Sequence, residues 1–487
     1  MADQRTTAQR HDSARQPPVL VVDLDGTLLR SDMLFECFWS ACGRDWRAPF
    51  AALAALGRGR AALKQHLAAA ARVDVATLPY EPLVLTEVQR WRDGGGRTAL
   101  VTASDHRLAM AIAAHLGLFD DVQGSDDGRN LKGEHKGRYL EERFGAGGFA
   151  YMGDAAADVA VWRRAGQAIT VNAAARVRRA AEAACADTRH LGGRAAGLEP
   201  WARVLRPHQW LKNLLVLLPM LAAHQLDLPT LLRALLAFFS FSFIASSVYV
   251  LNDLLDLAAD RTHPRKSARP FAAGSVPIAH GGPLAAALLL AGLGGAAILG
   301  TAFLAVMLGY FLLTSAYSLV LKRRIVIDIC VLAGLYTLRI IAGGVATGIP
   351  LSVWLLAFSL FFFLALAAVK RQAELIDSAA RGKLTASGRG YHVEDLPIIS
   401  MIGLGAGYVS VLVAALYVNS PAVVERYRTP EALWGVCVVL LFWVTRTVLV
   451  THRGQMHDDP VVFAARDGTS RLCLLIILAL LLVGALA

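Results

Sequence analysis

Residues 248–276 read VYVLNDLLDLAADRTHPRKSARPFAAGSV and join the end of an apolar run to three aspartates and a basic segment. Asp253, Asp256 and Asp260 are spaced i, i+3 and i+7, which places them on one face of a helix. Carboxylates at a membrane boundary are costly and are rarely structural without partners. Since Mg²⁺ commonly binds one or two carboxylates together with substrate phosphates, the pattern predicts an Mg²⁺ site for a diphosphate. A solvated, charge-paired helix end is the alternative.

Three neighbouring residues extend this predicted site. Asn252 directly precedes Asp253 and joins the candidate metal ligands, while Lys266 and Arg269 are candidates for binding substrate phosphates.

Apolar runs of membrane length continue from this stretch in both directions, from Trp210 to the last residue. Residues 283–321 carry no charge and are too long for one span, so they predict two spans joined by a turn near Gly300. We therefore expect an all-α bundle of nine spans, at residues 210–223, 231–251, 283–299, 301–321, 325–341, 351–369, 396–418, 433–450 and 472–487.

The charge pattern supports this membrane assignment. The chain is 55% hydrophobic with a net charge of +11, and the basic residues of its second half cluster between apolar runs. That placement favours lipid headgroups and phosphorylated substrates over nucleic acid. The loops after the even-numbered spans hold most of these cations, whereas the outer loops hold only Arg426 and Arg428. The positive-inside rule then puts both candidate sites on the cytoplasmic side of the cytoplasmic membrane and the C-terminus outside.

The first 200 residues predict a separate domain. Residues 1–17 form a polar leader with no apolar core, so we expect no secretory signal and a cytoplasmic domain after it. Strand-like runs then alternate with helical patterns, which predicts a parallel α/β sheet over 18–186, with an inserted helical cap at about 33–90. Residues 187–202 read as a linker to the membrane domain at 203–487. The six scattered cysteines predict no disulfides.

Asp23 and Asp25 lie in the motif DLDGT at the end of the first predicted strand. Hydrolysis of a phosphate ester needs a nucleophile, a proton donor for the leaving oxygen and positive charge on the phosphoryl oxygens. The two carboxylates can supply the first two, and Mg²⁺ and a lysine the third. The alternative is an ordinary turn with surface polar residues. The further candidates follow other strand-like runs: Thr102 in TALVT, Lys136 in NLKGEHKG, and Asp154 and Asp158 in GDAAAD.

Together these four motifs resemble those of the haloacid dehalogenase superfamily, with its Rossmann-like fold, in order and at ordinary spacing. The resemblance implies that Asp23 is the nucleophile and Asp25 the acid/base. It implies that Thr102 and Lys136 hold the phosphate, with Lys132 a weaker choice than Lys136. The residues it implies around Mg²⁺ are Asp23, Asp25, Asp154 and Asp158.

NDxxDxxxD followed by a basic loop, together with nine spans, resembles the UbiA superfamily. Family members ionise a diphosphate ester on Mg²⁺ and transfer the resulting cation. The motifs RPHQWLKNLLVLLP, YSLVLKRRIVIDIC, LRIIAGGVATGIPLS and VKRQAEL narrow the resemblance to the decaprenyl-phosphate phosphoribosyltransferase branch. That branch transfers 5-phosphoribose from phosphoribosyl pyrophosphate to a polyprenyl phosphate.

One departure supports the same branch. Aromatic prenyltransferases of the superfamily carry a second aspartate-rich motif near the end of the sixth span, where this chain has Lys370 and Arg371. Cations there fit substrates with additional phosphates, although they are also ordinary flanks of a span. Asp328 and Arg339 lie within the fifth span and are either functional or part of a structural ion pair. Lys212 and Lys322 are further phosphate-binding candidates, and residues 457–459 (HDD) read as a solvated loop.

These expectations combine into one hypothesis. The membrane domain makes a polyprenyl-phosphoryl-5-phosphoribose, and the attached phosphatase removes its 5-phosphate. The main rival is transfer of a prenyl group to an aromatic or other small acceptor, with an unrelated substrate for the phosphatase. A second rival makes the N-terminal domain a regulatory module without catalysis.

Overall fold

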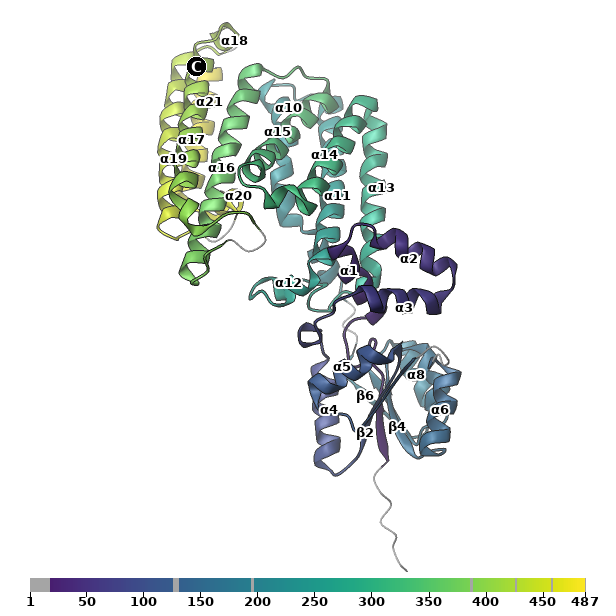
Figure 1. Cartoon of the computed structure of the whole chain (residues 1–487). Helices are drawn as coiled ribbons and strands as arrows, with labels where there is room; N and C mark the ends of the chain where they lie inside the picture. Colours follow the sequence, from purple (N-terminus) through teal and green to yellow (C-terminus); the bar gives the residue numbers. More distant parts are fainter. Residues whose placement is uncertain are drawn as a thin grey trace, which may run out of the picture. The chain divides into compact units, whose positions relative to one another are not determined.

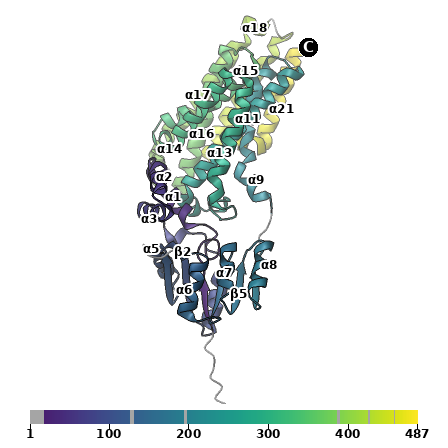
Figure 2. The same ribbon diagram turned by 90° about the vertical axis from the view of Figure 1, so that its right-hand side faces the viewer.

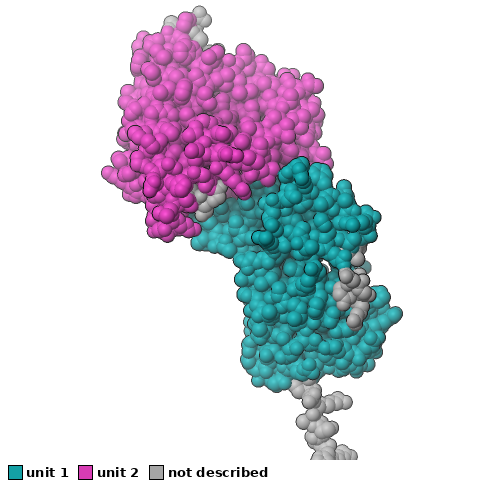
Figure 3. Space-filling model, in the orientation of Figure 1, with its two compact units in different colours: residues 1–205, 250–284 teal, residues 206–249, 285–487 magenta. Residues whose placement is uncertain are grey.

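The structure is a computed structural model that describes residues 18–125, 131–193, 197–385, 389–424, 427–456 and 459–486. The expected polar leader at 1–17 therefore lies outside the described residues. The chain forms two compact units, one of residues 1–205 and 250–284 and the other of 206–249 and 285–487 (Figure 3). The first unit thus includes the aspartate-rich segment, which the sequence had grouped with the membrane domain.

The N-terminal domain is built on a six-stranded parallel sheet, as predicted. Its central strands are short and mostly apolar, and they are buried on both faces, as a parallel sheet between helices requires. The strand order is β3-β2-β1-β4-β5-β6. The strands are β1 (Val19–Val22), β2 (Thr98–Asp105), β3 (Asp121–Ser125), β4 (Phe149–Gly153), β5 (Gln167–Val171) and β6 (Thr188–Leu191).

Helices cover both faces of this sheet (Figure 1). On one face, α4 (Pro82–Asp93) and α5 (His106–Leu116) enclose a core that includes Leu20, Val22 and Leu100. On the other, α6 (Glu134–Phe144), α7 (Val159–Trp162) and α8 (Ala175–Ala184) pack on Val21 and Tyr151. Because β1 and β4 are adjacent and parallel, the residues that follow them meet at one edge of the sheet.

A helical cap follows β1, as expected. It consists of α1 (Met33–Arg44), α2 (Ala48–Gly57), α3 (Arg60–Ala70) and the short 3₁₀ helix η1 (Val75–Thr77), with α1 to α3 grouped together (Figure 2). The cap ends earlier than the expected residue 90, because α4 packs against the sheet. At the other end, β6 extends the sheet to Leu191, past the expected boundary at 186, and α9 (Glu199–Leu205) follows.

In the described residues, eight helices are long and apolar enough to cross a membrane. The turn expected near Gly300 is present, with φ of +115° at that glycine. All six cysteines are free. The eight helices are α11 (Leu228–Leu255), α13 (Gly281–Leu299), α14 (Thr301–Leu319), α15 (Ile327–Thr347), α16 (Val353–Ala380), α17 (Leu396–Val418), α19 (Leu433–His452) and α21 (Gly468–Leu486).

The nine-span count is not confirmed, because the segment expected as the first span is not a long α-helix. It forms the 3₁₀ helix η3 (Pro207–Leu217) and the five-residue helix α10 (Leu218–Ala222). Pro207 begins η3, and Pro219 is the second residue of α10. Proline lacks the backbone N–H that an α-helix interior uses, so it interrupts an α-helical hydrogen-bond ladder.

Shorter elements complete the chain: α12 (Leu257–Arg261), η4 (Lys266–Ala268) and η5 (Ile278–His280) between α11 and α13, η6 (Leu321–Arg323), η7 (Val393–Asp395), α18 (Pro421–Val424), η8 (Pro430–Ala432) and α20 (Pro460–Arg466).

Candidate functional sites

Asp23 lies directly after β1, where the sequence predicted a nucleophile. Its Oδ1 accepts hydrogen bonds from the backbone N–H of Leu24, at 2.8 Å, and from Lys136 Nζ on α6, at 2.7 Å. The Lys136 side chain is only 3% exposed, so it is buried against this carboxylate. The structure therefore brings the first and third predicted motifs together and favours Lys136 over Lys132.

Asp25 is held by two donors that position its carboxyl group. Its Oδ1 accepts from the N–H of Met33, at 2.8 Å, and its Oδ2 accepts from Ser104 Oγ, at 2.6 Å. Burial, reinforced by the negative charge of Asp32, raises the pKa of Asp25 to about 7. A carboxyl group with that pKa can both give and take a proton near neutral pH, as an acid/base residue must.

Thr102 and Ser104 lie at the carboxyl end of β2. Thr102 is fully buried, and its hydroxyl accepts from the N–H of Ser104 at 3.0 Å. Sequence reasoning missed Ser104, although it lies two residues beyond Thr102 on the same strand. Since alternate side chains of a strand share a face, that spacing was the available signal.

Asp154 and Asp158 follow β4, which neighbours β1. A Cβ atom on Gly26 would lie 2.5 Å from Asp154 Oδ2, so the DLDGT loop and Asp154 approach closely only because residue 26 is glycine. Asp158 Oδ1 accepts from the hydroxyl of Tyr151 at 2.9 Å, and that hydroxyl accepts from Lys136 at 3.0 Å. Sequence reasoning also missed Tyr151.

The charges of this cluster fit a divalent cation. Lys136 contacts Asp23 directly and Asp158 through Tyr151, and Asp25 and Asp154 belong to the same acidic group. Burial raises the pKa of Asp154 to about 7 and that of Asp158 to about 6. No three carboxylate, histidine or cysteine side chains form a ready-made metal cage in the described residues. Mg²⁺ does not need one, because it keeps several waters and takes one or two carboxylates plus substrate oxygens.

The aspartate-rich segment keeps its predicted grouping, although the helix is interrupted. α11 ends at Leu255 and α12 begins at Leu257, with Asp256 between them. Asp253 and Asp260 nevertheless converge on Nη1 of Arg269, at 3.1 and 2.5 Å. Both aspartates are nearly fully buried. Two carboxylates that converge on one cation have the spacing and chemistry that also suit Mg²⁺.

The other candidates of this segment lie around that core. Asn252 and Asp256 are half-buried, and the backbone N–H of Asp256 donates to the carbonyl of Asn252 at 2.9 Å. Lys266 begins η4 and is exposed.

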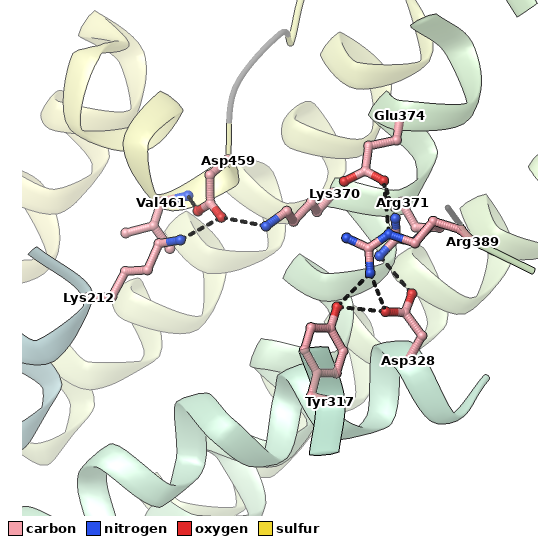
Figure 4. Close-up of polar contacts among 9 residues, drawn as sticks. All are labelled: Lys212, Tyr317, Asp328, Lys370, Arg371, Glu374, Arg389, Asp459 and Val461. Carbon is pink, nitrogen blue, oxygen red and sulfur yellow. Dashed lines mark hydrogen bonds and ion pairs between the residues drawn. The ribbon is translucent and has the colours of Figure 1, made fainter. Parts of the chain in front are cut away.

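A second group of charges lies in the helical bundle (Figure 4). Lys212 from η3 and Lys370 from α16 both contact Asp459 Oδ2, at 2.7 and 3.1 Å. Although burial alone would raise it, the two ammonium groups hold the pKa of Asp459 well below its usual range. The expected solvated loop at 457–459 is thus wrong for Asp459, which is largely buried. His457 and Asp458 lie outside the described residues.

Arg371, the neighbour of Lys370, belongs to a different network (Figure 4). Its guanidinium pairs with Asp328 of α15 at 2.6 Å, and neither side chain is exposed. Asp328 also accepts from Tyr317 at 2.7 Å and pairs with Arg389 at 3.0 Å, while Arg371 contacts Glu374. Asp328 thus forms an ion pair with another helix, which is the structural alternative expected for it, and the geometry favours a structural role for Arg371 over the predicted phosphate contact.

Arg339 and Lys322 complete the predicted candidates. Arg339 is buried in α15, where its Nε donates to Asn213 Oδ1 at 2.9 Å. Its guanidinium lies 5.0–5.6 Å from the ring centroids of Phe241, Tyr310 and Tyr336. Lys322 lies half-buried in η6.

Comparison with known families assigns both parts of the chain. The model of the UbiA prenyltransferase family matches residues 213–466, and that of haloacid dehalogenase-like hydrolases matches residues 20–187.

Three relatives match different fractions of the chain. The uncharacterized protein y4nM of Sinorhizobium fredii is 37% identical over 454 residues, which are 93% of this chain and 88% of that protein. Nodulation protein NoeC of Azorhizobium caulinodans is 37% identical over 56% of this chain and 90% of its own length. Decaprenyl-phosphate phosphoribosyltransferase of Mycobacterium tuberculosis is 44% identical over 178 residues, which are 36% of this chain and 59% of that enzyme.

Proposed function

Because this chain belongs to the UbiA prenyltransferase family and carries a haloacid dehalogenase-like hydrolase domain, we propose that it is a bifunctional membrane enzyme of phosphoribosyl-lipid synthesis. The UbiA domain transfers 5-phosphoribose from phosphoribosyl pyrophosphate to a polyprenyl phosphate, with decaprenyl phosphate the reference case. The hydrolase domain then removes the 5-phosphate of the product.

The observation that carries this proposal is the 44% identity to decaprenyl-phosphate phosphoribosyltransferase. The basic pair around Asp459 supports it. Lys212 and Lys370 converge on one anionic oxygen, and a phosphate oxygen of the donor or of the lipid presents the same charge and hydrogen-bonding capacity. A neutral aromatic acceptor would gain nothing from two cations.

In the transfer step, the anomeric C–O bond to diphosphate breaks, and an oxygen of the lipid phosphate forms the new bond to that carbon. Asp253 and Asp256 are the catalytic aspartates. Together with Asn252 and Asp260 they would hold Mg²⁺, which would supply positive charge to the diphosphate leaving group. Lys266 and Arg269 bind donor phosphates from the basic segment. Lys212, Lys370, Lys322 and Arg339 bind or orient the remaining phosphates.

In the hydrolytic step, Asp23 attacks the phosphorus and Asp25 donates a proton to the leaving 5-oxygen of ribose. Asp25 then takes a proton from the water that cleaves the phosphoaspartate. Lys136 and Thr102 hold the phosphoryl oxygens. Mg²⁺ held by Asp23, Asp154 and the surrounding carboxylates of Asp25 and Asp158 supplies further positive charge.

Both steps take place on the cytoplasmic side of the membrane under this proposal. The N-terminal domain and residues 250–284 belong to one compact unit, so they lie on the same side. Since α11 crosses the membrane between them, residues 206–227 cross it as well. A 3₁₀ helix rises about 2.0 Å per residue, so η3 and α10 together are about 30 Å long, which matches the hydrocarbon core. The proposal therefore has nine crossings, with the C-terminus outside.

Mass analysis of lipid products tests the proposal. The purified full chain, in vesicles with Mg²⁺, is given phosphoribosyl pyrophosphate and polyprenyl phosphate. We expect a ribosyl lipid without the 5-phosphate, and an Asp23→Asn variant that accumulates the phosphorylated lipid. Product from a polyprenyl diphosphate and an aromatic acceptor, with none from phosphoribosyl pyrophosphate, would replace our proposal by prenyl transfer. Release of phosphate at the wild-type rate by Asp23→Asn would remove the assigned nucleophile.

A further inference from the structure

Helix α2 of the hydrolase cap buries its small apolar residues and exposes its large ones. Ala48, Ala52 and Ala55 are buried against the rest of the domain. Trp46, just before the helix, and Phe50 and Leu53 within it are 68%, 66% and 68% exposed. A helix on the surface of a water-soluble domain normally turns its large apolar side chains inward.

The exposed residues form one continuous stripe. Trp46, Phe50 and Leu53 follow the i, i+4, i+7 spacing of a helix face, and Leu56 extends it at 45% exposure. The rings of Trp46 and Phe50 pack edge to face with centroids 6.3 Å apart. Contiguous exposed apolar surface of this kind marks a contact with another apolar phase or with a partner.

Arginines flank the stripe at both ends. Arg47 precedes α2, and its guanidinium lies 5.4 Å from the ring centroid of Trp46. Arg58 caps the other end of the helix and is exposed. Large apolar side chains with flanking cations are the composition of helices that lie in the surface of an anionic bilayer.

The neighbouring helix α1 ties the cap to residues that enter the membrane. A Cβ atom on Gly43 would lie 3.1 Å from the carbonyl oxygen of Leu255, the last residue of α11. A Cβ atom on Gly282, in the first turn of α13, would lie 3.6 Å from the ring of Trp39. The cap is therefore packed against the ends of two candidate spans.

A buried ion pair strengthens this attachment. Glu36 of α1 pairs with Arg261 of α12 at 2.6 Å, and the two side chains are 4% and 7% exposed. A charged pair with so little exposure is costly to separate, because each partner would be left unpaired in a buried position. The attachment thus joins α1, and with it α2, to the segment that ends α11 and begins α13.

We propose that the outer stripe of α2, formed by Trp46, Phe50, Leu53 and Leu56, docks into the surface of an anionic lipid bilayer. Two observations favour a lipid bilayer as the binding partner of this stripe. The large apolar side chains of α2 face outward, and the cap contacts the ends of two candidate spans. The docking depends only on the membrane attachment of the chain, so it stands apart from the proposed chemistry. It would hold the cap of the hydrolase at the surface where a lipid-borne phosphomonoester lies.

Photolabelling from the lipid phase tests the docking. The full chain is placed in vesicles of phosphatidylglycerol and phosphatidylcholine that contain a phospholipid with a diazirine on its acyl chain. After illumination and digestion, labelling of the peptide from α2 is compared with labelling of the peptide that carries Met110 of α5. Met110 is a matched reference, because it is a large apolar residue of the same domain with 47% exposure. We expect the α2 peptide to carry about tenfold more label.

Two variants sharpen the result. Phe50→Glu with Leu53→Glu should lower labelling of the α2 peptide to the level of the α5 peptide, while Met110→Glu should leave α2 labelling unchanged. The unfolding temperature of each variant is measured beside its labelling, and the wild-type labelling ratio does not depend on either substitution. Equal labelling of the α2 and α5 peptides in the wild type would overturn the proposal.

Discussion

The hydrolase cluster and the charged group of the helical bundle have opposite charge imbalances. The hydrolase cluster contains four aspartates and one lysine, Lys136, which pairs with Asp23. Burial raises the pKa of Asp154 in this cluster to about 7. In the second, Lys212 and Lys370 share one carboxylate, and Asp459 has its pKa held low. An excess of buried carboxylates is stabilised by a bound cation, and an excess of ammonium groups is stabilised by a bound anion. The comparison therefore supports the proposal that the first region binds a metal ion and the second binds phosphate.

The largest expected effect is the loss of phosphate-ester hydrolysis at the acidic cluster of the hydrolase domain, with the transfer reaction unaffected. Asp23→Asn should lower hydrolysis of p-nitrophenyl phosphate by at least about 10⁴-fold, because an amide cannot form the phosphoaspartate. Transfer from phosphoribosyl pyrophosphate should continue at the wild-type rate. Asp74→Asn is the matched control, since Asp74 only caps η1 in the exposed part of the cap. Loss of both activities in Asp23→Asn would show that the two sites are not separate.

The next effect concerns the aspartate-rich segment. Asp253→Ala combined with Asp256→Ala should lower phosphoribosyl transfer by about 10³-fold, since the diphosphate would lose its metal-borne charge stabilisation. Hydrolysis of p-nitrophenyl phosphate should be unaffected. Asp377→Ala serves as the control, because Asp377 pairs with Arg381 at the exposed end of α16. Transfer that persists in the double variant would remove the proposed transferase site.

A stability measurement separates Arg371 from its neighbour Lys370. Arg371→Met should destabilise the protein by about 3–5 kcal/mol, because it leaves the buried Asp328 without its closest cation. Asp328→Asn in the same chain should recover part of that loss. The comparison uses unfolding midpoints in detergent. An unchanged midpoint together with a raised KM for phosphoribosyl pyrophosphate would restore the phosphate-binding role that the sequence predicted for Arg371.

The smallest effect tests the basic pair. Lys370→Met should lower kcat/KM for phosphoribosyl transfer by about 10- to 100-fold, which corresponds to one charge-assisted contact with a phosphate. Lys383→Met is a suitable control, since Lys383 is exposed just beyond the same helix. The expected loss should be absent from hydrolysis of p-nitrophenyl phosphate. A Lys370→Met enzyme with wild-type transfer kinetics would place the anion site elsewhere.

Much of the hydrolase site could be read from the chain. Asp23, Asp25 and Asp154 each follow a strand, and in a parallel sheet the carboxyl ends of neighbouring strands meet at one edge. Local sequence spacing was therefore sufficient to predict that these three aspartates lie close together. Tyr151 lies inside β4 as one apolar-looking residue among others, and only the contact of its hydroxyl with Lys136 and Asp158 reveals its place in the cluster.

The basic region was harder to read for a related reason. Lys212 and Asp459 are far apart in the sequence, and their pairing depends on how η3 and the chain before α20 pack. Residues 457–459 look like an ordinary polar loop, so the buried position of Asp459 could not be anticipated. The same holds for residues 210–223, where a run of apolar residues suggested an α-helix and the structure has a 3₁₀ helix followed by a short α-helix.

The sequence by itself determined the two domains, their families, the parallel sheet and most of the membrane helices, because these follow from local periodicity and from motifs with short spacing. Only the tertiary structure decided which charges meet. It paired Arg371 with Asp328, joined Lys212 and Lys370 at Asp459, and packed the cap against the ends of α11 and α13. Such contacts join residues from distant parts of the chain, and their free energy depends on burial that no local pattern records.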